Sequence, residues 1–302
     1  MELIYKVMPK DYQLIHASDL HIGPLCCFKQ GVRDMVNYVK SNEDTYLAFT
    51  GDAIDAILPN DRRYNHSSMD KEDWLMTPQD QADRVIELFM PIKDKILFWG
   101  LGNHEYKIIN SFDIARYICR HLNVPWGGVM CKFIARHPNN RTAHKFLFTH
   151  GAGSLSSNAK DPIQRKANMQ AALKQKLINT GHTDTIYQGC GHFHRDILCP
   201  PNVGDEVLLT DENYEIKQEP RYWADQTADY IPPECRWYAC SPGFLKTYAP
   251  TGINSISYPE TFMYGPTRLG WVLLDIKDSK LYDVKQIDAN EFTKQNGGSN
   301  GK

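Results

Sequence analysis

Short apolar runs alternate with amphipathic stretches over the first two thirds of the chain. Runs of four to eight branched and aromatic residues indicate buried strands. We predict five such strands, at 13–18, 45–50, 95–100, 145–149 and 185–188. Between them apolar residues recur at helical spacing, for example at positions 32, 35, 36 and 39, and Asp161 followed by Pro162 is typical of a helix start. Strands and helices that alternate in this way predict a layered α/β domain.

The chain changes character after about residue 195. Nine of its 17 prolines lie between Pro200 and Pro266, and no long amphipathic pattern occurs there. Two later apolar runs, at 268–276 and 281–287, are typical of a closing hairpin. The sequence therefore predicts an α/β core with a β-rich, loop-rich C-terminal extension. Its expected parts are a core over 1–196, an aromatic- and proline-rich cap over 197–266, closing strands over 267–290 and a disordered tail over 291–302.

Composition narrows the class of protein. Lys and Arg number 34 against 36 Asp and Glu, so the net charge of −2 gives no bulk attraction to nucleic acid or to an anionic membrane. No apolar run approaches the roughly 20 residues of a membrane span, and residues 1–10 lack the apolar core of a signal peptide. The eight cysteines form no CxxC pair, which argues against a disulfide framework or a zinc finger. We expect a cytoplasmic protein without a membrane partner, and its oligomeric state stays open.

Each of the five predicted strands is followed at once by side chains that can bind a metal ion. In chain order they are Asp19 and His21, Asp52 and Asp55, Asn103 and His104, His150, and His192 and His194. The carboxyl ends of strands share one edge of an open α/β sheet, so these side chains are expected to converge. Glycines stand beside every cluster, as tight turns around a crowded site require.

These side chains suffice for two divalent ions. One ion would be bound by Asp19, His21, Asp52 and His194. The second would be bound by Asp52, acting as a bridge, with Asn103, His150 and His192. Nitrogen and oxygen ligands without thiolate suit Mn, Fe, Zn or Ni. A bridging carboxylate enforces the separation of ~3.5–4 Å that two-metal hydrolysis uses.

The ordered motifs DxH, GDxxD, GNHE, H and GHxH resemble those of the calcineurin-like metallophosphoesterases, and no motif residue is missing over residues 13–196. The resemblance implies an αββα four-layer sandwich and a dinuclear metal centre, with manganese as the ion we expect first. It implies hydrolysis of phosphoesters by a hydroxide that bridges the ions. It also implies that His104 protonates the leaving oxygen and that Asp55 orients His104.

The residue after Asp55 departs from one branch of that family. The Ser/Thr protein phosphatases have an arginine there that clamps phosphate, whereas this chain has Ala56. A clamp must therefore come from elsewhere, and the polar insertion over 59–79 follows the second motif directly. Its candidate substrate contacts are Arg62, Arg63 and His66.

A phosphodiester or nucleotide-type substrate is the preferred hypothesis over a phosphoprotein. It depends on Ala56 and on the 11 aromatic residues among the 51 over 214–264, since rings stack on bases. Small β-rich caps also pack their own cores with such rings, and we favour that interpretation of the aromatic segment.

Two other functions stay open. A DNA exo- or endonuclease of the double-strand-break-repair type is the first, because residues 16–23 resemble the first motif of those nucleases. The net charge of −2 and the lack of an extended basic stripe argue against a polyanionic substrate, so nucleic acid is a possible but not a favoured partner. The second is a non-catalytic binding scaffold, against which the complete set of ligands argues.

Overall fold

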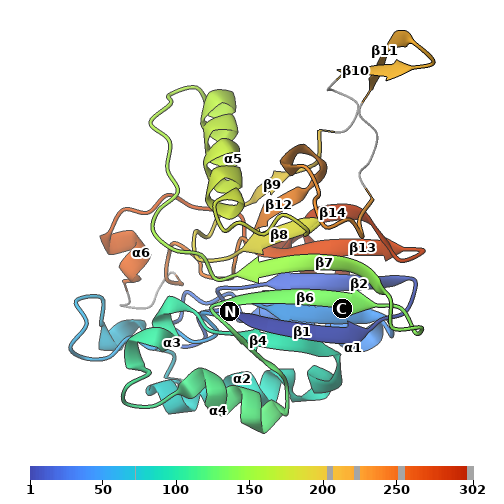
Figure 1. Ribbon diagram of the computed structural model, residues 1–302. Coiled ribbons are helices and arrows are strands. Elements are labelled where there is room, and N and C mark those ends of the chain that lie inside the picture. The colour runs from blue at the N-terminus through green and yellow to red at the C-terminus, as the bar shows by residue number, and fades with distance from the viewer. Residues whose placement is uncertain (72, 203–206, 221–224, 251–255, 298–302) are drawn as a thin grey trace.

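Two six-stranded sheets packed face to face form the centre of the computed structural model (Figure 1). The structure describes residues 1–71, 73–202, 207–220, 225–250 and 256–297. The first sheet consists, in spatial order, of β14 (Lys280–Asp288), β13 (Gly270–Lys277), β2 (Tyr12–Ala17), β3 (Thr45–Phe49), β4 (Ile96–Gly100) and β5 (Trp126–Gly128). The second consists of β1 (Glu2–Val7), β6 (Met130–Arg136), β7 (Thr142–Thr149), β8 (Tyr187–Cys190), β12 (Trp237–Cys240) and β9 (Ile197–Cys199).

Helices cover the outer face of each sheet (Figure 1). The first sheet is covered by α1 (Lys29–Ser41), α2 (Pro78–Phe89), α4 (Ile114–Leu122) and α7 (Ala289–Gly297), whose apolar residues share one core with it. The second sheet is covered by α5 (Pro162–Ile178), through a smaller core. A third core fills the space between the sheets. The predicted order of helix, sheet, sheet and helix is therefore confirmed.

Five shorter segments complete the helices. They are α3 (Asn103–Ile108), α6 (Tyr258–Thr261) and the 3₁₀ turns η1 (His66–Ser68), η2 (Met90–Lys95) and η3 (Pro233–Cys235). The start of α5 is as predicted, because the Asp161 side chain accepts a hydrogen bond from Gln164 N over 2.7 Å and Pro162 takes the first helical position. No helix among the described residues has both the length and the apolar character needed to cross a bilayer.

The segment predicted as a separate cap over 197–266 contributes to the core instead. β12 pairs in parallel with β8 and antiparallel with β9, so both strands extend the second sheet. The boundary at 196 is therefore wrong for these two strands, because backbone pairing, which composition does not reveal, includes them in the sheet. The rest of the segment includes α6 and the hairpin of β10 (Val207–Glu212) and β11 (Glu215–Pro220), which projects from the body (Figure 1).

The tail expected to be disordered from 291 begins as the helix α7. Phe292 explains the difference, since its ring lies 5.6 Å from that of Tyr38 and 5.2 Å from that of Trp271. This aromatic anchor docks the helix on the first sheet, so the prediction is wrong for residues 291–297. Residues 298–302 lie outside the described part of the chain.

Parallel pairing sets the direction in which the strands end. β2, β3 and β4 run parallel to one another in the first sheet, as do β7 and β8 in the second. The loops that follow these five strands therefore leave from a common side of the sandwich, which is where ligands bind in α/β sheets.

Phe148 sits at the centre of the core between the sheets. Its ring is fully buried and lies within 5.6 Å of the rings of His16, Phe98 and Tyr187. Truncation of a buried phenylalanine leaves a cavity that the two rigid sheets cannot close. We therefore expect Phe148→Ala to lower the free energy of unfolding by about 3–5 kcal/mol, measured by urea denaturation.

The matched control for this substitution is Ile163→Ala, since Ile163 is 81% exposed on α5. It is expected to change the same free energy by less than about 0.5 kcal/mol. A loss below about 1 kcal/mol for Phe148→Ala would contradict the tight packing between the sheets.

Candidate metal centre

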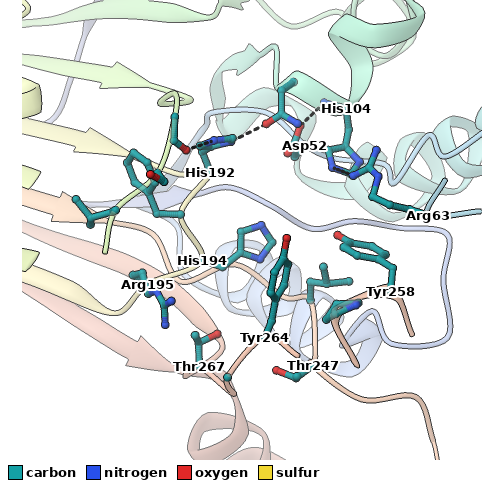
Figure 2. Close-up of a pocket in the computed structure, with 18 residues that line it drawn as sticks. Asp52, Arg63, His104, His192, His194, Arg195, Thr247, Tyr258, Tyr264 and Thr267 are labelled. Carbon is teal, nitrogen blue, oxygen red and sulfur yellow. Dashed lines mark hydrogen bonds between the residues drawn. The ribbon is translucent and has the colours of Figure 1, made fainter. Parts of the chain in front are cut away.

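The five loops bring all the residues expected at the metal centre into one cluster. Three loops come from the first sheet, where β2 leads to Asp19 and His21, β3 to Asp52 and Asp55, and β4 to Asn103 and His104. Two come from the second sheet, where β7 leads to His150 and β8 to His192 and His194. The cluster therefore spans the seam between the sheets. Figure 2 shows four of its members, Asp52, His104, His192 and His194, on the wall of a pocket.

The backbone at five of the expected ligands has a left-handed conformation, which costs a residue other than glycine about 1–2 kcal/mol. These residues are Asp19 (φ 56°), His21 (φ 48°), Asp52 (φ 55°), His192 (φ 68°) and His194 (φ 49°). Hydrogen bonds between loops hold two of them, from Asp19 N to Gly51 O over 3.0 Å and from His21 N to Asp52 O over 3.1 Å. Strain thus gathers where side chains must point inward, a common property of functional sites.

Gly102 and Gly191 let the carboxylates of Asp52 and Asp19 approach the backbone closely. A Cβ at Gly102 would lie 2.0 Å from Asp52 Oδ1, and a Cβ at Gly191 would lie 2.5 Å from Asp19 Oδ2. Both separations are shorter than any real contact of a Cβ, so only glycine fits at either position.

Asp19, His21 and His194 form the first ligand group, with ligand atoms all within 4.8 Å of one another. Nδ1 of His21 lies 3.2 Å from Asp55 Oδ1 and donates to it, so Nε2 of the neutral ring carries a lone pair. That lone pair faces Nε2 of His194 at 3.2 Å. Asp19 Oδ1 lies 3.3 Å from the same nitrogen of His194, and Asp52 Oδ2 lies 3.8 Å from His21 Nε2.

Asp52, His150 and His192 form the second group, and Asn103 lies between the two histidines. His150 Nδ1 donates to Thr50 O over 3.1 Å, which leaves Nε2 facing Asp52 Oδ2 at 3.3 Å. His192 Nε2 donates to Gly153 O over 3.0 Å, which leaves Nδ1 facing Asn103 Oδ1 at 2.6 Å. Asp52 thus contacts both groups, as a bridging carboxylate must.

A cation would satisfy atoms that the protein leaves without partners. Asp19 Oδ1 is buried, yet it accepts no hydrogen bond from any described residue. An unpaired buried carboxylate oxygen is costly, and so are nitrogen and oxygen lone pairs that face one another. Imidazole, carboxylate and amide donors without thiolate suit the divalent ions Mn, Fe, Zn and Ni. The donor set therefore fits a pair of divalent ions.

Neighbouring charges shift the pKa values within the cluster. Burial opposes the charged form of His150, but the carboxylate of Asp52 raises the pKa of His150 to about 9. Burial also opposes ionisation of Asp19, yet the imidazole of His194 lowers the pKa of Asp19 to about 2. The pKa of His21 is raised against burial by its hydrogen bond to Asp55. Protons therefore compete with metal ions for the imidazole of His150 at neutral pH.

Glu105 fixes the loop that carries Asp52. Its carboxylate accepts hydrogen bonds from the backbone N–H groups of Asp52 (3.1 Å), Ala53 (2.6 Å), Ile54 (3.3 Å) and Gly102 (3.1 Å). Burial and the charge of Asp52 raise the pKa of Glu105 to about 7, while these four donors favour its ionised form. Glu105 therefore holds the backbone of Asp52, a candidate ligand, in place.

Asp55 holds His104 through its backbone rather than through its carboxylate. His104 Nδ1 donates to the carbonyl oxygen of Asp55 over 2.5 Å, whereas the nearer carboxylate oxygen lies 3.6 Å away. That oxygen makes the shorter contact with His21 instead, at 3.2 Å. The expected pairing of Asp55 with His104 is present, but by a different atom, because His21 occupies the carboxylate. Burial lowers the pKa of His104 to about 4.

Of the three candidate substrate contacts, only Arg63 borders the pocket. Asp61 holds its guanidinium through Nε at 3.0 Å and Nη2 at 2.7 Å, and Nη1 donates to His104 Nε2 over 3.2 Å. Arg62 packs over the ring of Phe262 at 5.3 Å, and His66 is exposed in η1. The structure therefore places Arg62 and His66 away from the pocket.

The remaining pocket walls come from residues that the motifs did not predict. They are chiefly Arg195, Thr247, Tyr258, Tyr264 and Thr267, with a cavity of about 370 Å³ between them and the cluster (Figure 2). Arg195 directly follows the last motif, which was the one available signal. The other four belong to loops without any motif, so only the folded chain shows that they share a site.

Residues 12–235 match the sequence model of the calcineurin-like phosphoesterases. The match covers more than half of the chain and includes every loop of the cluster. The chain belongs to the calcineurin-like phosphoesterase family. It is therefore a metal-dependent hydrolase that acts on phosphoester bonds, and the family works with a dinuclear divalent metal centre. No curated protein matches the sequence of this phosphoesterase.

Solved structures similar to the phosphoesterase are distant from it. NAD nucleotidase (NadN) of Haemophilus influenzae is 13% identical, with a TM-score of 0.35 over 91% of this chain and 49% of that one. A conserved uncharacterized protein of Streptococcus pneumoniae TIGR4, a predicted phosphoesterase, is 10% identical, with a TM-score of 0.29 over 92% and 97%. Calcineurin-like phosphoesterase YfkN of Bacillus subtilis is 10% identical, with a TM-score of 0.33 over 95% and 97%. The phosphoesterase thus spans about half the length of the NAD nucleotidase.

Binding of metal to the phosphoesterase is expected to strengthen as pH rises. The carboxylate of Asp52 raises the pKa of His150 to about 9, so this ring holds an extra proton at pH 7 when no metal is bound, and the hydrogen bond to Asp55 raises the pKa of His21 in the same direction. Each proton must leave before its nitrogen can bind a cation, so the affinity for Mn²⁺ should rise up to about tenfold per pH unit for each proton displaced. Isothermal titration at pH 6.5, 7.5 and 8.5, in buffers of different ionisation enthalpy, measures both the affinity and the protons released. An affinity that is flat over this range, without proton release, would contradict the proposed competition.

Proposed function

We propose that this phosphoesterase hydrolyses phosphodiester or nucleotide-type substrates, with two metal ions between the sheets. Asp19, His21, Asp52 and His194 would hold one ion, and Asp52, Asn103, His150 and His192 the other, with manganese as the preferred ion. The observation that supports the proposal most is that inward nitrogens of the cluster face other nitrogen or oxygen atoms, Nε2 of His21 facing His194 and Nδ1 of His192 facing Asn103. These atoms lie at the base of a pocket that Arg63 and His104 border. Bound there, the ions would supply a water of lowered pKa and neutralise phosphoryl oxygens.

Arg63 is the residue we assign to binding phosphate, in place of the arginine that this chain lacks at position 56. Ala56 is 5% exposed and its backbone N–H is bound to Gln81 Oε1 at 3.0 Å, so no side chain at that position points into the pocket. The guanidinium of Arg63 approaches from the insertion over 59–79 and is held in place by Asp61. A guanidinium fixed in this way offers its remaining N–H groups to phosphoryl oxygens with little loss of side-chain entropy.

His104 is the residue we assign to the leaving group. Its Nδ1 is committed to the carbonyl oxygen of Asp55, so Nε2 is the nitrogen that faces the pocket, beside Arg63. The backbone N–H of His104 also donates to Asp52 Oδ1 over 2.8 Å, which fixes the residue relative to the bridging carboxylate. Nε2 accepts a hydrogen bond from Arg63 in this structure, so it would take up a proton in place of that bond before delivering it to an oxygen that departs from phosphorus.

The pocket favours a small substrate, or the end of a longer one. Its volume of about 370 Å³ falls near the lower limit of small-molecule sites, roughly 300–1,000 Å³. The rings of Tyr258 and Tyr264 border it, and flat groups stack on such rings.

The eight cysteines are unpaired and buried, which supports action in a reducing compartment such as the cytoplasm.

The role of His104 is tested by the dependence of rate on the leaving group. His104→Ala should slow hydrolysis of an alkyl phosphodiester, which leaves poorly, by about 10²–10⁴-fold, because the departing alkoxide needs a proton. A p-nitrophenyl diester needs none and should be slowed far less. Rates with Mn²⁺ are measured alongside metal content, which should stay at two ions per chain.

The matched control is His121→Ala, since His121 is exposed on α4 and its ring lies 4.0 Å from that of Tyr117, outside the cluster. It should leave both rates unchanged. Loss of metal in His104→Ala would instead make His104 a ligand, a role that its proximity to His21 and Asp52 also permits. Equal slowing of the two esters with full metal content would exclude His104 as the acid.

A further inference from the structure

Arg195 is a charged side chain of the pocket for which the proposed reaction has no use. It lies between β8 and β9, directly after His194, and it is half-buried on the pocket wall. Among the described residues, no carboxylate, carbonyl oxygen or aromatic ring contacts its guanidinium. Partial burial without a counter-ion is unfavourable for a cation, so an anion in the pocket would stabilise it.

Two nearby arginines are neutralised, which makes Arg195 distinctive. Asp61 binds Arg63 at 2.7 Å, and Asp196 binds Arg268 at 3.0 Å. No acid among the described residues pairs with Arg195. The five N–H donors of its guanidinium are therefore available to a ligand.

Two hydroxyl groups border the pocket together with Arg195. Thr247 and Thr267 come from separate parts of the chain, both are half-buried, and neither hydroxyl has a hydrogen-bond partner among the described residues. Figure 2 shows Arg195 beside Thr267 on the side of the pocket away from Arg63. A free guanidinium with two free hydroxyls has the donor chemistry that binds phosphate.

The rings of Tyr264 and Tyr258 stand between the two arginines in Figure 2, and both border the same cavity. A ligand that reached from Arg63 to Arg195 would therefore cross an aromatic surface. A flat ring system would stack there, whereas a flexible alkyl chain would gain less.

We propose that Arg195, Thr247 and Thr267 bind a second phosphate group of the substrate, remote from the phosphate that is cleaved. This inference rests on the proposed function and deepens it. The substrate class is then a nucleotide that carries a phosphate at each of two sugar hydroxyls. Two molecules share that chemistry: a free nucleoside bisphosphate and the terminal nucleotide of an oligonucleotide.

The test compares the p-nitrophenyl ester of thymidine 5′-phosphate with the same ester that carries a 3′-phosphate. The reacting ester is identical in both, so only the second anion differs. The wild-type enzyme with Mn²⁺ should have a value of kcat/KM at least tenfold higher for the 3′-phosphorylated ester. Arg195→Gln should lose that preference and keep its rate on the ester without the 3′-phosphate within about twofold. Arg268→Gln, which removes a neighbouring guanidinium that is already paired, should retain the preference.

A third ester separates the two sources of the second phosphate. When the 3′-phosphate is joined to a further thymidine, it has one charge fewer and a neighbouring sugar. A preference kept or increased with this ester assigns the site to the end of an oligonucleotide. A preference lost with it assigns the site to a free bisphosphate.

Failure of the inference can be told apart from failure of the proposed function. Equal rates for the first two esters in the wild-type enzyme would overturn the second phosphate site and leave the hydrolase proposal intact. Hydrolysis of no ester would overturn the proposed function, and equilibrium binding then still tests the site. Metal-free protein should bind thymidine 3′,5′-bisphosphate at least tenfold more tightly than thymidine 5′-phosphate, and Arg195→Gln should abolish the difference. If Arg195→Gln does not fold, Thr267→Val, which should reduce the preference severalfold, replaces it.

Discussion

The site depends on lone pairs that the protein points at one another. Hydrogen bonds from the outer nitrogens of His21, His150 and His192 to Asp55, Thr50 and Gly153 fix which nitrogen of each ring faces inward. Each inward nitrogen then lies 2.6–3.3 Å from a nitrogen or oxygen atom of another residue of the cluster. Protons or cations must lie between such atoms, because the alternative is repulsion in a buried space. This one constraint explains why five loops from two sheets are needed.

That arrangement strains the backbone of the loops. Five ligand residues have left-handed backbones, and two glycines allow contacts that no Cβ permits. Rigid sheets beneath the loops oppose relaxation, since the buried core between them includes the closely packed rings of Phe98, Phe148 and Tyr187. Metal ions that bound only the folded state would add stability by mass action and so offset the strain of the loops.

Sequence patterns predict the ligand set because a ligand must have one of few chemical types, and because each follows a strand. The αββα order and the family were predicted from the same strands and motifs, and both are confirmed. Sequence patterns do not predict which atom of a residue makes a given contact. Asp55 illustrates this, since its carbonyl holds His104 while its carboxylate holds His21. The two strands β9 and β12, and the helix α7, were missed because composition does not reveal backbone pairing or the docking of one ring, that of Phe292.

The walls of the pocket are the least predictable part. Arg62, Arg63 and His66 are close in sequence, yet Asp61 directs only Arg63 inward. Arg195, Thr247 and Thr267 come from three segments that no motif connects. The candidate ligands can therefore be predicted from the residue types at the strand ends. The other residues of the pocket cannot, because they lie in loops without motifs.

Anomalous diffraction from crystals of the enzyme soaked in Mn²⁺ shows whether this cluster holds two ions. We predict two peaks ~3.5–4 Å apart, with Asp52 between them, the imidazoles of His21 and His194 beside one and those of His150 and His192 beside the other. A single peak, or two peaks that do not share Asp52, would contradict this prediction.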